Sequence, residues 1–174
     1  MTRTLVTYAS RMGGTEGIAR AIADEMQRAG IDVDLRPAAD VRSVTGYDAV
    51  VLGSAVYAGR WLRPARTLLK RLVASRPPAD PPRVWLFHSG PLGTDRATDA
   101  VPVPARVAAA ASALGADQPT TFGGRLEPAT ASGFLAGRMA KSDMAGDYRD
   151  FDRIIAWAAA IAAHLRGSTA GASS

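Results

Sequence analysis

The feature that most restricts the fold of this chain is an unbroken apolar run that ends at Gly53. Residues 47–53 read Tyr-Asp-Ala-Val-Val-Leu-Gly, and residues 84–87 read Val-Trp-Leu-Phe. Because neither run alternates between apolar and polar residues, both predict strands that are buried on both faces. Such strands belong to parallel sheets that carry helices on both sides. The chain is therefore expected to adopt an α/β fold.

The remaining segments complete an alternation of strands and helices. Strands are predicted at residues 3–8, 31–36, 47–53, 84–87 and about 120–122, and the alternating pattern of the second suits an edge position. Helices are predicted at 15–29, 64–74, 105–114 and about 150–166, with a short helical turn at 41–44. Loops at 54–61 and 88–101, a surface connector at 77–82 and an irregular stretch before residue 146 join them. This pattern specifies a doubly wound five-stranded parallel sheet in one domain, residues 1–166, with a flexible C-terminal tail, residues 167–174.

The composition excludes several classes of function. The chain of 174 residues has no cysteine, which excludes disulfides, thiolate metal sites and redox dithiols, so redox chemistry would need a bound cofactor. No metal site is predicted. No apolar run reaches about 18 residues and the chain opens on a strand pattern, so a soluble cytoplasmic protein is expected. The net charge of +5 favours anionic partners: an acidic metabolite, an acidic protein or, by peripheral contact, a phospholipid surface. Nucleic acid is not expected, since no helix-turn-helix or aromatic-interleaved basic ribbon is present.

A turn suited to an anion joins the first predicted strand to the first predicted helix. Residues 8–16 read Tyr-Ala-Ser-Arg-Met-Gly-Gly-Thr-Glu. Gly13 and Gly14 let the backbone approach a ligand, Ser10 and Thr15 add hydroxyl groups, and the helix dipole favours negative charge. The turn is neither a Walker loop nor G-x-G-x-x-G, so a phosphate monoester fits better than a triphosphate or a dinucleotide. The alternative is an ordinary turn in which Thr15 is the helix N-cap.

Three stretches follow strands that are central to the predicted sheet. They are residues 10–15 after the first strand, 54–61 after the third and 88–93 after the fourth. In doubly wound sheets the ligand lies beyond the carboxyl ends of the strands, where the strand order reverses. The three stretches are therefore expected to meet in one crevice.

These stretches resemble the flavodoxin family. Residues 8–16 are similar to its phosphate loop, usually Ser/Thr-x-Thr-Gly-x-Thr. Residues 52–59 (Leu-Gly-Ser-Ala-Val-Tyr-Ala-Gly) are similar to the loop that covers the isoalloxazine ring. Residues 89–93 (Ser-Gly-Pro-Leu-Gly) stand where the second ring loop of the family occurs. The resemblance covers residues 3 to about 166 and implies a flavodoxin-like fold, strand order 2-1-3-4-5, with bound flavin mononucleotide (FMN). It assigns to the cofactor Ser10, Arg11, Met12, Gly13, Gly14, Thr15, Ser54, Ala55, Val56, Tyr57, Ala58, Gly59, Ser89, Gly90, Pro91, Leu92 and Gly93.

Within the superfamily, the chain looks most like the menaquinone-dependent protoporphyrinogen oxidase branch and its flavodoxin-domain relatives. The similar features are the basic phosphate loop, the Gly-Ser-Ala start of the second loop, and Gly-Asp…Asp-Phe-Asp at residues 146–152. The chain lacks the long aromatic-rich insertion of those oxidases, which weakens the transfer of their substrate. Met12 replaces a hydroxyl residue of the phosphate loop, so backbone N–H groups and Arg11 would have to compensate. The second ring loop has no tyrosine, which leaves one ring face open to a substrate.

Three side chains near the expected crevice have two interpretations each. Tyr57 and Trp61 are the aromatic residues expected beside the flavin ring, with ordinary packing as the alternative. His88 follows a buried strand and is the candidate catalytic residue, as a hydrogen-bond or proton donor at the flavin edge. A structural histidine with satisfied nitrogens is the alternative.

The resemblance implies two main functions of different classes. The first is an FMN-dependent oxidoreductase that passes electrons between an organic substrate, expected to be anionic, and a quinone-type acceptor. The second is an electron-transfer flavodoxin without a substrate of its own. Carriers of that family are typically acidic, so the charge of +5 favours the enzyme. A third interpretation, a fold that has lost its cofactor and serves interaction alone, rests on Met12.

Overall fold

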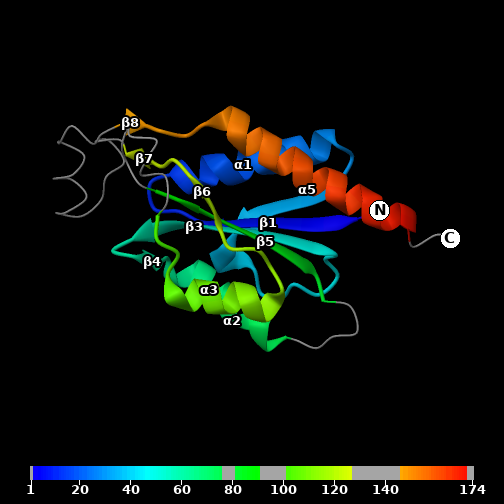
Figure 1. Ribbon diagram of the computed structural model, residues 1–174, viewed down its shortest axis with the longest axis horizontal. Helices are drawn as coiled ribbons and strands as arrows, with labels where there is room; N and C mark the ends of the chain where they lie inside the picture. The colour runs from blue at the N-terminus through cyan, green and yellow to red at the C-terminus, as the bar shows by residue number, and fades with distance from the viewer. Residues whose placement is uncertain (1, 76–80, 91–100, 127–145, 172–174) are drawn as a thin grey trace.

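The computed structural model describes residues 2–75, 81–90, 101–126 and 146–171, and it confirms the predicted α/β fold (Figure 1). Its sheet contains β1 (Arg3–Ala9), β2 (Asp32–Pro37), β3 (Ala49–Tyr57), β5 (Arg83–Ser89) and β6 (Thr120–Phe122), in the order β2-β1-β3-β5-β6. Every neighbouring pair along this order is parallel. Counted along these five strands the order is 2-1-3-4-5, as predicted, and β2 lies at an edge.

Helices cover both faces of the sheet. Helices α1 (Gly14–Arg28) and α5 (Phe151–Gly171) lie on one face, and α2 (Arg63–Ala74) and α3 (Ala105–Leu114) lie on the other (Figure 1). The unbroken apolar run in β3 serves both layers, because successive side chains of a strand point to opposite faces. Val50 and Leu52 are buried with α2 and α3, whereas Val51 is buried with α1 and α5.

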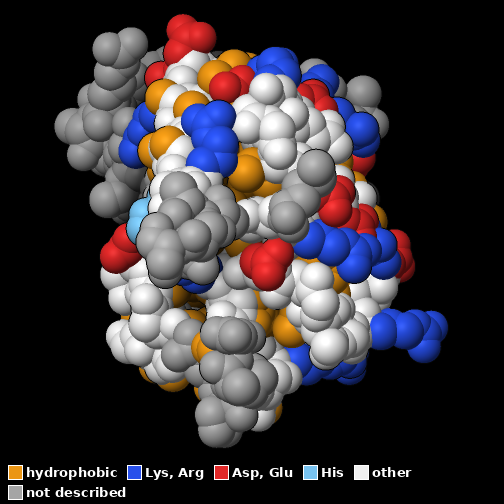
Figure 2. Space-filling view, turned by 90° about the vertical axis from the view of Figure 1, so that its right-hand side faces the viewer, with side chains coloured by type: hydrophobic (Ala, Val, Ile, Leu, Met, Phe, Trp, Pro, Cys, Tyr) orange, Lys and Arg blue, Asp and Glu red, His pale blue; other side chains and the backbone are white. Residues whose placement is uncertain are grey.

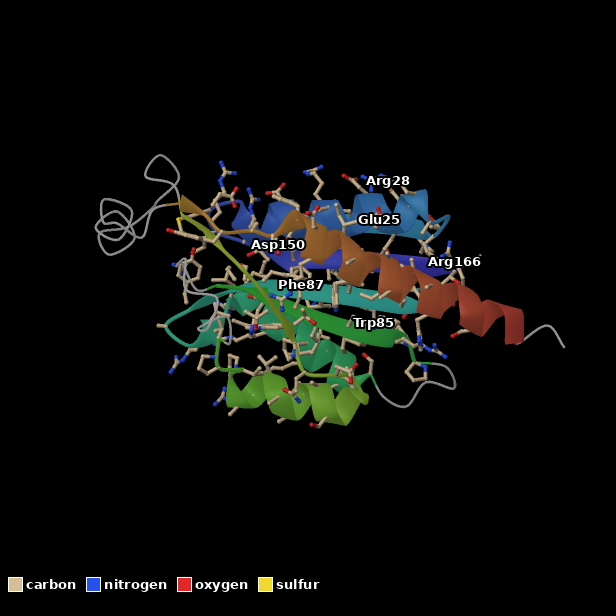
Figure 3. The ribbon with its side chains drawn as sticks, turned by 45° about the horizontal axis from the view of Figure 1, so that its top comes forward. Glu25, Arg28, Trp85, Phe87, Asp150 and Arg166 are labelled. Carbon is tan, nitrogen blue, oxygen red and sulfur yellow. The ribbon has the colours of Figure 1, made fainter. Side chains whose placement is uncertain are left out.

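A close approach between neighbouring strands explains the glycine that ends this run. Gly53 of β3 pairs in register with Phe87 of β5, so a side chain at either position points to the same face. A Cβ added at Gly53 would fall within 3.0 Å of three ring atoms of Phe87. The ring cannot retreat freely, since it is fully buried against Phe122 and Trp157 of β6 and α5. Figure 3 shows Phe87 on its strand within the sheet.

Three predicted boundaries were wrong. Residues 41–44 are not helical; the short helical turn is a 3₁₀ turn, η1 (Ala38–Asp40), which starts directly after Pro37, and Val41 is extended. The predicted loop 54–61 is mostly strand, because β3 continues to Tyr57 and pairs antiparallel with β4 (Arg60–Trp61). The last helix continues past residue 166 to Gly171, so residues 167–171 of the predicted tail are helical.

Part of the predicted irregular stretch also carries structure. Residues 125–126 (β7, Arg125–Leu126) and 146–147 (β8, Gly146–Asp147) form an antiparallel ribbon. Most of the predicted connector 77–82 and residues 91–93 of the second ring loop lie outside the described residues. Within the described ranges, no helix combines the length and apolar character that crossing a membrane requires.

Candidate functional site

The N-terminus of α1 has no side-chain cap among the described residues. Gly13 is its N-cap, with φ of 77° in the left-handed region, and no side chain caps the helix. The first N–H groups of the helix therefore lack the side-chain acceptor that usually satisfies one of them. A Cβ added at Gly13 would meet none of the described atoms within 4 Å. The alternative in which Thr15 is the N-cap is wrong, because Thr15 lies inside the helix.

Thr15 instead joins two of the predicted loops. Its hydroxyl Oγ1 shares a buried hydrogen bond of 2.6 Å with Ser89 Oγ, at the end of β5. Thr15 is 1% exposed and Ser89 is 6% exposed. Gly90, with φ of 140°, follows Ser89 and donates its N–H to the carbonyl of Phe122 at 3.1 Å. The loops after the first strand and after β5 are thus fixed against each other, as the crevice prediction requires.

The loop after β3 is a tight hairpin. Tyr57 pairs with Arg60, and the two residues between them, Ala58 and Gly59, have φ of 48° and 68°. Positive φ at both positions is what a two-residue type I′ turn requires. Gly59 suits this conformation, whereas Ala58 is a non-glycine residue under local strain. The hairpin therefore presents a fixed backbone turn beside the carboxyl ends of β1 and β3.

Ser54 supports this hairpin from inside. It is fully buried, its Oγ accepts the N–H of Leu62 at 2.9 Å, and its hydroxyl donates to the carbonyl of Ala55 at 2.8 Å. Both polar roles of the side chain are therefore used within the protein. Of the predicted contacts from this residue, only a backbone contact to a ligand remains compatible with the geometry.

Arg11 and Tyr57 connect the phosphate-type loop to the hairpin. The guanidinium carbon of exposed Arg11 lies 5.2 Å from the ring centroid of half-buried Tyr57, within cation–π range. Burial raises the pKa of the Tyr57 hydroxyl, and the Arg11 cation opposes that increase. Neutral Tyr57 thus offers an aromatic surface at the site, and Arg11 points to that surface. Met12 and Ser10 are partly exposed at the same turn.

His88 and Trp61 belong to the protein interior. Trp61 Nε1 donates to His88 Nδ1 at 3.3 Å, and His88 Nε2 lies 2.8 Å from Thr121 Oγ1. The first bond makes Nδ1 the acceptor, so Nε2 carries the proton and donates to Thr121. Burial lowers the pKa of His88 to about 4, which keeps the ring neutral. With both nitrogens engaged and both rings buried, the structure favours the structural interpretation of each residue.

The β7–β8 ribbon packs against the first turns of α1, a contact that the sequence analysis missed. A Cβ at Gly14 would lie 3.3 Å from the backbone nitrogen of Arg125, and a Cβ at Gly17 would overlap the guanidinium of Arg149. Arg149 is only 8% exposed and donates to the Asp147 carboxylate through Nε at 2.7 Å. The spacing of Gly14 and Gly17 on one helix was the available signal, because only residues without a side chain admit such close neighbours.

Of the predicted site residues, those at the turn 10–14 lie at the uncapped N-terminus of α1, and Arg11 links this turn to Tyr57 of the hairpin. Backbone N–H groups, the Ser10 hydroxyl and a nearby cation suit a phosphate ester, and Tyr57 suits an aromatic ring. The Thr15 hydroxyl is engaged by Ser89 instead. Residues 91–93 lie outside the described part of the chain. No cluster of three or more potential metal ligands occurs in the described residues.

A separate cavity lies at the other end of the sheet. It has a volume of about 300 Å³ and is lined by residues of the loop 42–47, α2, the start of β5 and the end of α3. Figure 2 views this pole, where basic and acidic side chains intermingle with apolar ones. It is separate from the donor set at the carboxyl ends of the strands.

Comparison with known proteins agrees with the fold. A family model described as a flavodoxin domain matches residues 5–134. Among solved structures, an archaeal flavodoxin aligns with a TM-score of 0.65 at 19% identity over 95% of this chain and 99% of its own. Flavodoxin 2 from Bacillus cereus aligns with a TM-score of 0.60 at 17% identity over 95% and 99%. Rubredoxin oxygen:oxidoreductase from Desulfovibrio gigas aligns with a TM-score of 0.65 at 18% identity over 98% of this chain but 37% of its own. At these identities the structures support the fold alone. The curated proteins gave no match.

Proposed function

The chain belongs to the flavodoxin domain family, whose model covers residues 5–134, and from this premise we propose that it is a flavoprotein that transfers electrons. FMN is the cofactor of this fold, in which the nucleotide lies at the reversal point between β1 and β3. When bound, FMN supplies the one- and two-electron chemistry that this cysteine-free chain cannot carry on its own side chains.

The observation that carries the proposal is the uncapped N-terminus of α1, which a hydrogen bond ties to the end of β5. Gly13 leaves the first N–H groups uncapped, and the bond between Thr15 and Ser89 fixes the loops on either side. The phosphate of FMN would be held by these N–H groups and by the Ser10 hydroxyl. The turn at Ala58 and Gly59 would hold the ring end. The donors form without the hydroxyl that Met12 replaces, so the departure at Met12 does not remove the site.

For the reaction itself, we propose an oxidoreductase that passes electrons between an organic substrate and a quinone-type acceptor. Three exposed arginines, Arg11, Arg60 and Arg63, lie on or beside the loops of the site. Together with the net charge of +5, they favour an anionic substrate or an anionic membrane surface near the flavin. The resemblance to the protoporphyrinogen oxidase branch makes porphyrinogens the first substrates to test. The alternative is an electron carrier, which is supported by the similarity to structures named flavodoxin.

Flavin binding is tested directly by adding FMN to the purified protein and recording its absorption spectrum and fluorescence quenching. We expect a yellow complex with a stoichiometry near one, and stronger binding of FMN than of riboflavin, which lacks the phosphate. Absence of a complex would refute the cofactor assignment.

The reaction class is tested by anaerobic assays with the loaded protein. Turnover of a porphyrinogen with a quinone acceptor supports the enzyme. Rapid electron exchange with an acidic redox protein, together with no turnover of porphyrinogen or quinone, supports the carrier. Protein without added FMN serves as the control for both assays.

A further inference from the structure

The side chain of Arg11, in the phosphate-type loop, contacts the hairpin at the end of β3. Its guanidinium lies over the Tyr57 ring, 5.2 Å from the centroid, on the hairpin that forms the ring end of the site. None of the described carboxylates pairs with it. Because Tyr57 lies at the end of β3 while Arg11 follows β1, the contact holds a positive charge across the reversal point of the sheet.

The two loops that the Arg11–Tyr57 contact joins contain no acidic residue. Residues 10–15 and 54–63 include Arg11, Arg60 and Arg63 but no aspartate or glutamate. The next acidic residue along the chain, Glu16, already pairs with Arg20 at 3.1 Å. Among the described residues, the contact that Arg11 makes is therefore with the Tyr57 ring rather than with a carboxylate, and solvent screens its charge.

We propose that Arg11 is a positioning residue for the ring end of the cofactor, held there by Tyr57, and that its charge favours the reduced flavin. This inference rests on the proposed function. Oxidised FMN takes up two electrons and one proton at neutral pH, so the reduced ring carries one negative charge more than the oxidised ring. A fixed cation at the ring end stabilises that added charge and raises the reduction potential. A phosphate ligand would stabilise both redox states alike, because the phosphate keeps its charge.

The test compares Arg11→Gln and Arg11→Lys with a matched control, Arg42→Gln, which changes an exposed arginine in the loop at the opposite end of the sheet. For each protein, potentiometric titration gives the two-electron potential, and fluorescence quenching gives the affinities for FMN and riboflavin. We expect Arg11→Gln to lower the affinity for reduced relative to oxidised FMN by roughly tenfold, the order expected for one charge at a partly buried site. A tenfold change corresponds to a potential about 30 mV lower. Arg11→Lys should recover most of this change, and Arg42→Gln should resemble the unchanged protein.

The ratio of the FMN and riboflavin affinities separates the two roles of Arg11. We expect this ratio to stay constant in Arg11→Gln, since the phosphate contact is made by the helix terminus. A selective loss of FMN affinity, with or without a change in potential, would overturn the inference and make Arg11 a phosphate ligand. An unchanged potential would overturn it as well.

A Tyr57→Leu background tests whether the ring holds the cation. In that background Arg11→Gln should change the redox ratio by much less than tenfold, and an undiminished effect would refute the role of Tyr57. If the unchanged protein bound neither FMN nor riboflavin, the proposed function itself would fall, which is distinct from any result confined to the variants.

Discussion

Replacing Gly53 by alanine should strain the centre of the sheet. The added Cβ would fall within 3.0 Å of three atoms of the Phe87 ring, whereas ordinary contacts are 3.4–4 Å. Phe87 is 0% exposed and packs edge-on against Trp157 at a centroid distance of 6.0 Å, so the ring can yield only by disturbing its neighbours. Overpacking of this kind costs about 1–3 kcal/mol. For a domain of this size each kcal/mol lowers Tm by about 2–4 °C.

The cost should depend on Phe87, which a double-mutant cycle measures. Phe87→Leu alone should destabilise the fold by about 1–2 kcal/mol, less than a full truncation of the ring. Adding Gly53→Ala in that background should cost less than in the unchanged protein, with a coupling of about 0.5–3 kcal/mol. Gly167→Ala is the control, because its Cβ would meet nothing within 4 Å in α5, and it should stabilise the helix by about 0.5–1 kcal/mol.

Urea denaturation followed by far-UV circular dichroism gives these free energies from the midpoint and the slope. FMN affinity should fall in Gly53→Ala, because the next residue, Ser54, anchors the hairpin through Leu62. If Gly53→Ala were as stable as the unchanged protein, or if its cost were the same with leucine at position 87, the packing argument would be wrong.

Three further predictions concern the site. Burial lowers the pKa of His88 to about 4, below the usual 6.5 of the unfolded chain. The free energy of unfolding should therefore decrease by up to roughly 3 kcal/mol as pH falls from 6.5 to 4. Urea denaturation across this range should show the decrease, and His88→Gln should remove most of this pH dependence. Thr15→Val leaves the buried Ser89 hydroxyl without its partner and should lower the free energy of unfolding by about 1–3 kcal/mol. The double variant with Ser89→Ala should lose less stability than the sum of the two single variants, measured by the same denaturation. Gly13→Ala, at φ of 77°, should lower the free energy of unfolding by about 1–2 kcal/mol and weaken FMN binding. Asparagine tolerates this conformation better, so Gly13→Asn should recover part of the stability and part of the affinity. Equal behaviour of the two variants would contradict the conformational argument.

The order of strands and helices follows from local sequence patterns, since the period of apolar residues and the turn residues act over a few neighbours. The unbroken run at 49–52 therefore predicted a central parallel strand, and the glycine-rich turn at residues 10–15 was correctly predicted to connect β1 to α1. The end of β3, predicted at residue 53, could not be located from such local patterns. The continuation of β3 to Tyr57 depends on pairing with Arg60 and Trp61, and the intervening Ala58 carries no sequence signal for positive φ.

Roles of individual polar side chains depended on partners far away in the chain. Thr15 had the local pattern of an N-cap but bonds Ser89, 74 residues later. His88 had the position of a proton donor, yet Trp61 and Thr121 engage both of its nitrogens. Hydrogen bonds and burial of this kind are fixed only when the elements pack, because a side chain satisfies its polar atoms with whatever group the tertiary fold places beside it. The sequence by itself thus determined the sheet, its helical layers and the location of the cofactor loops. The tertiary structure alone decided which of the polar side chains near those loops are engaged within the protein, as Thr15, Ser54 and His88 are.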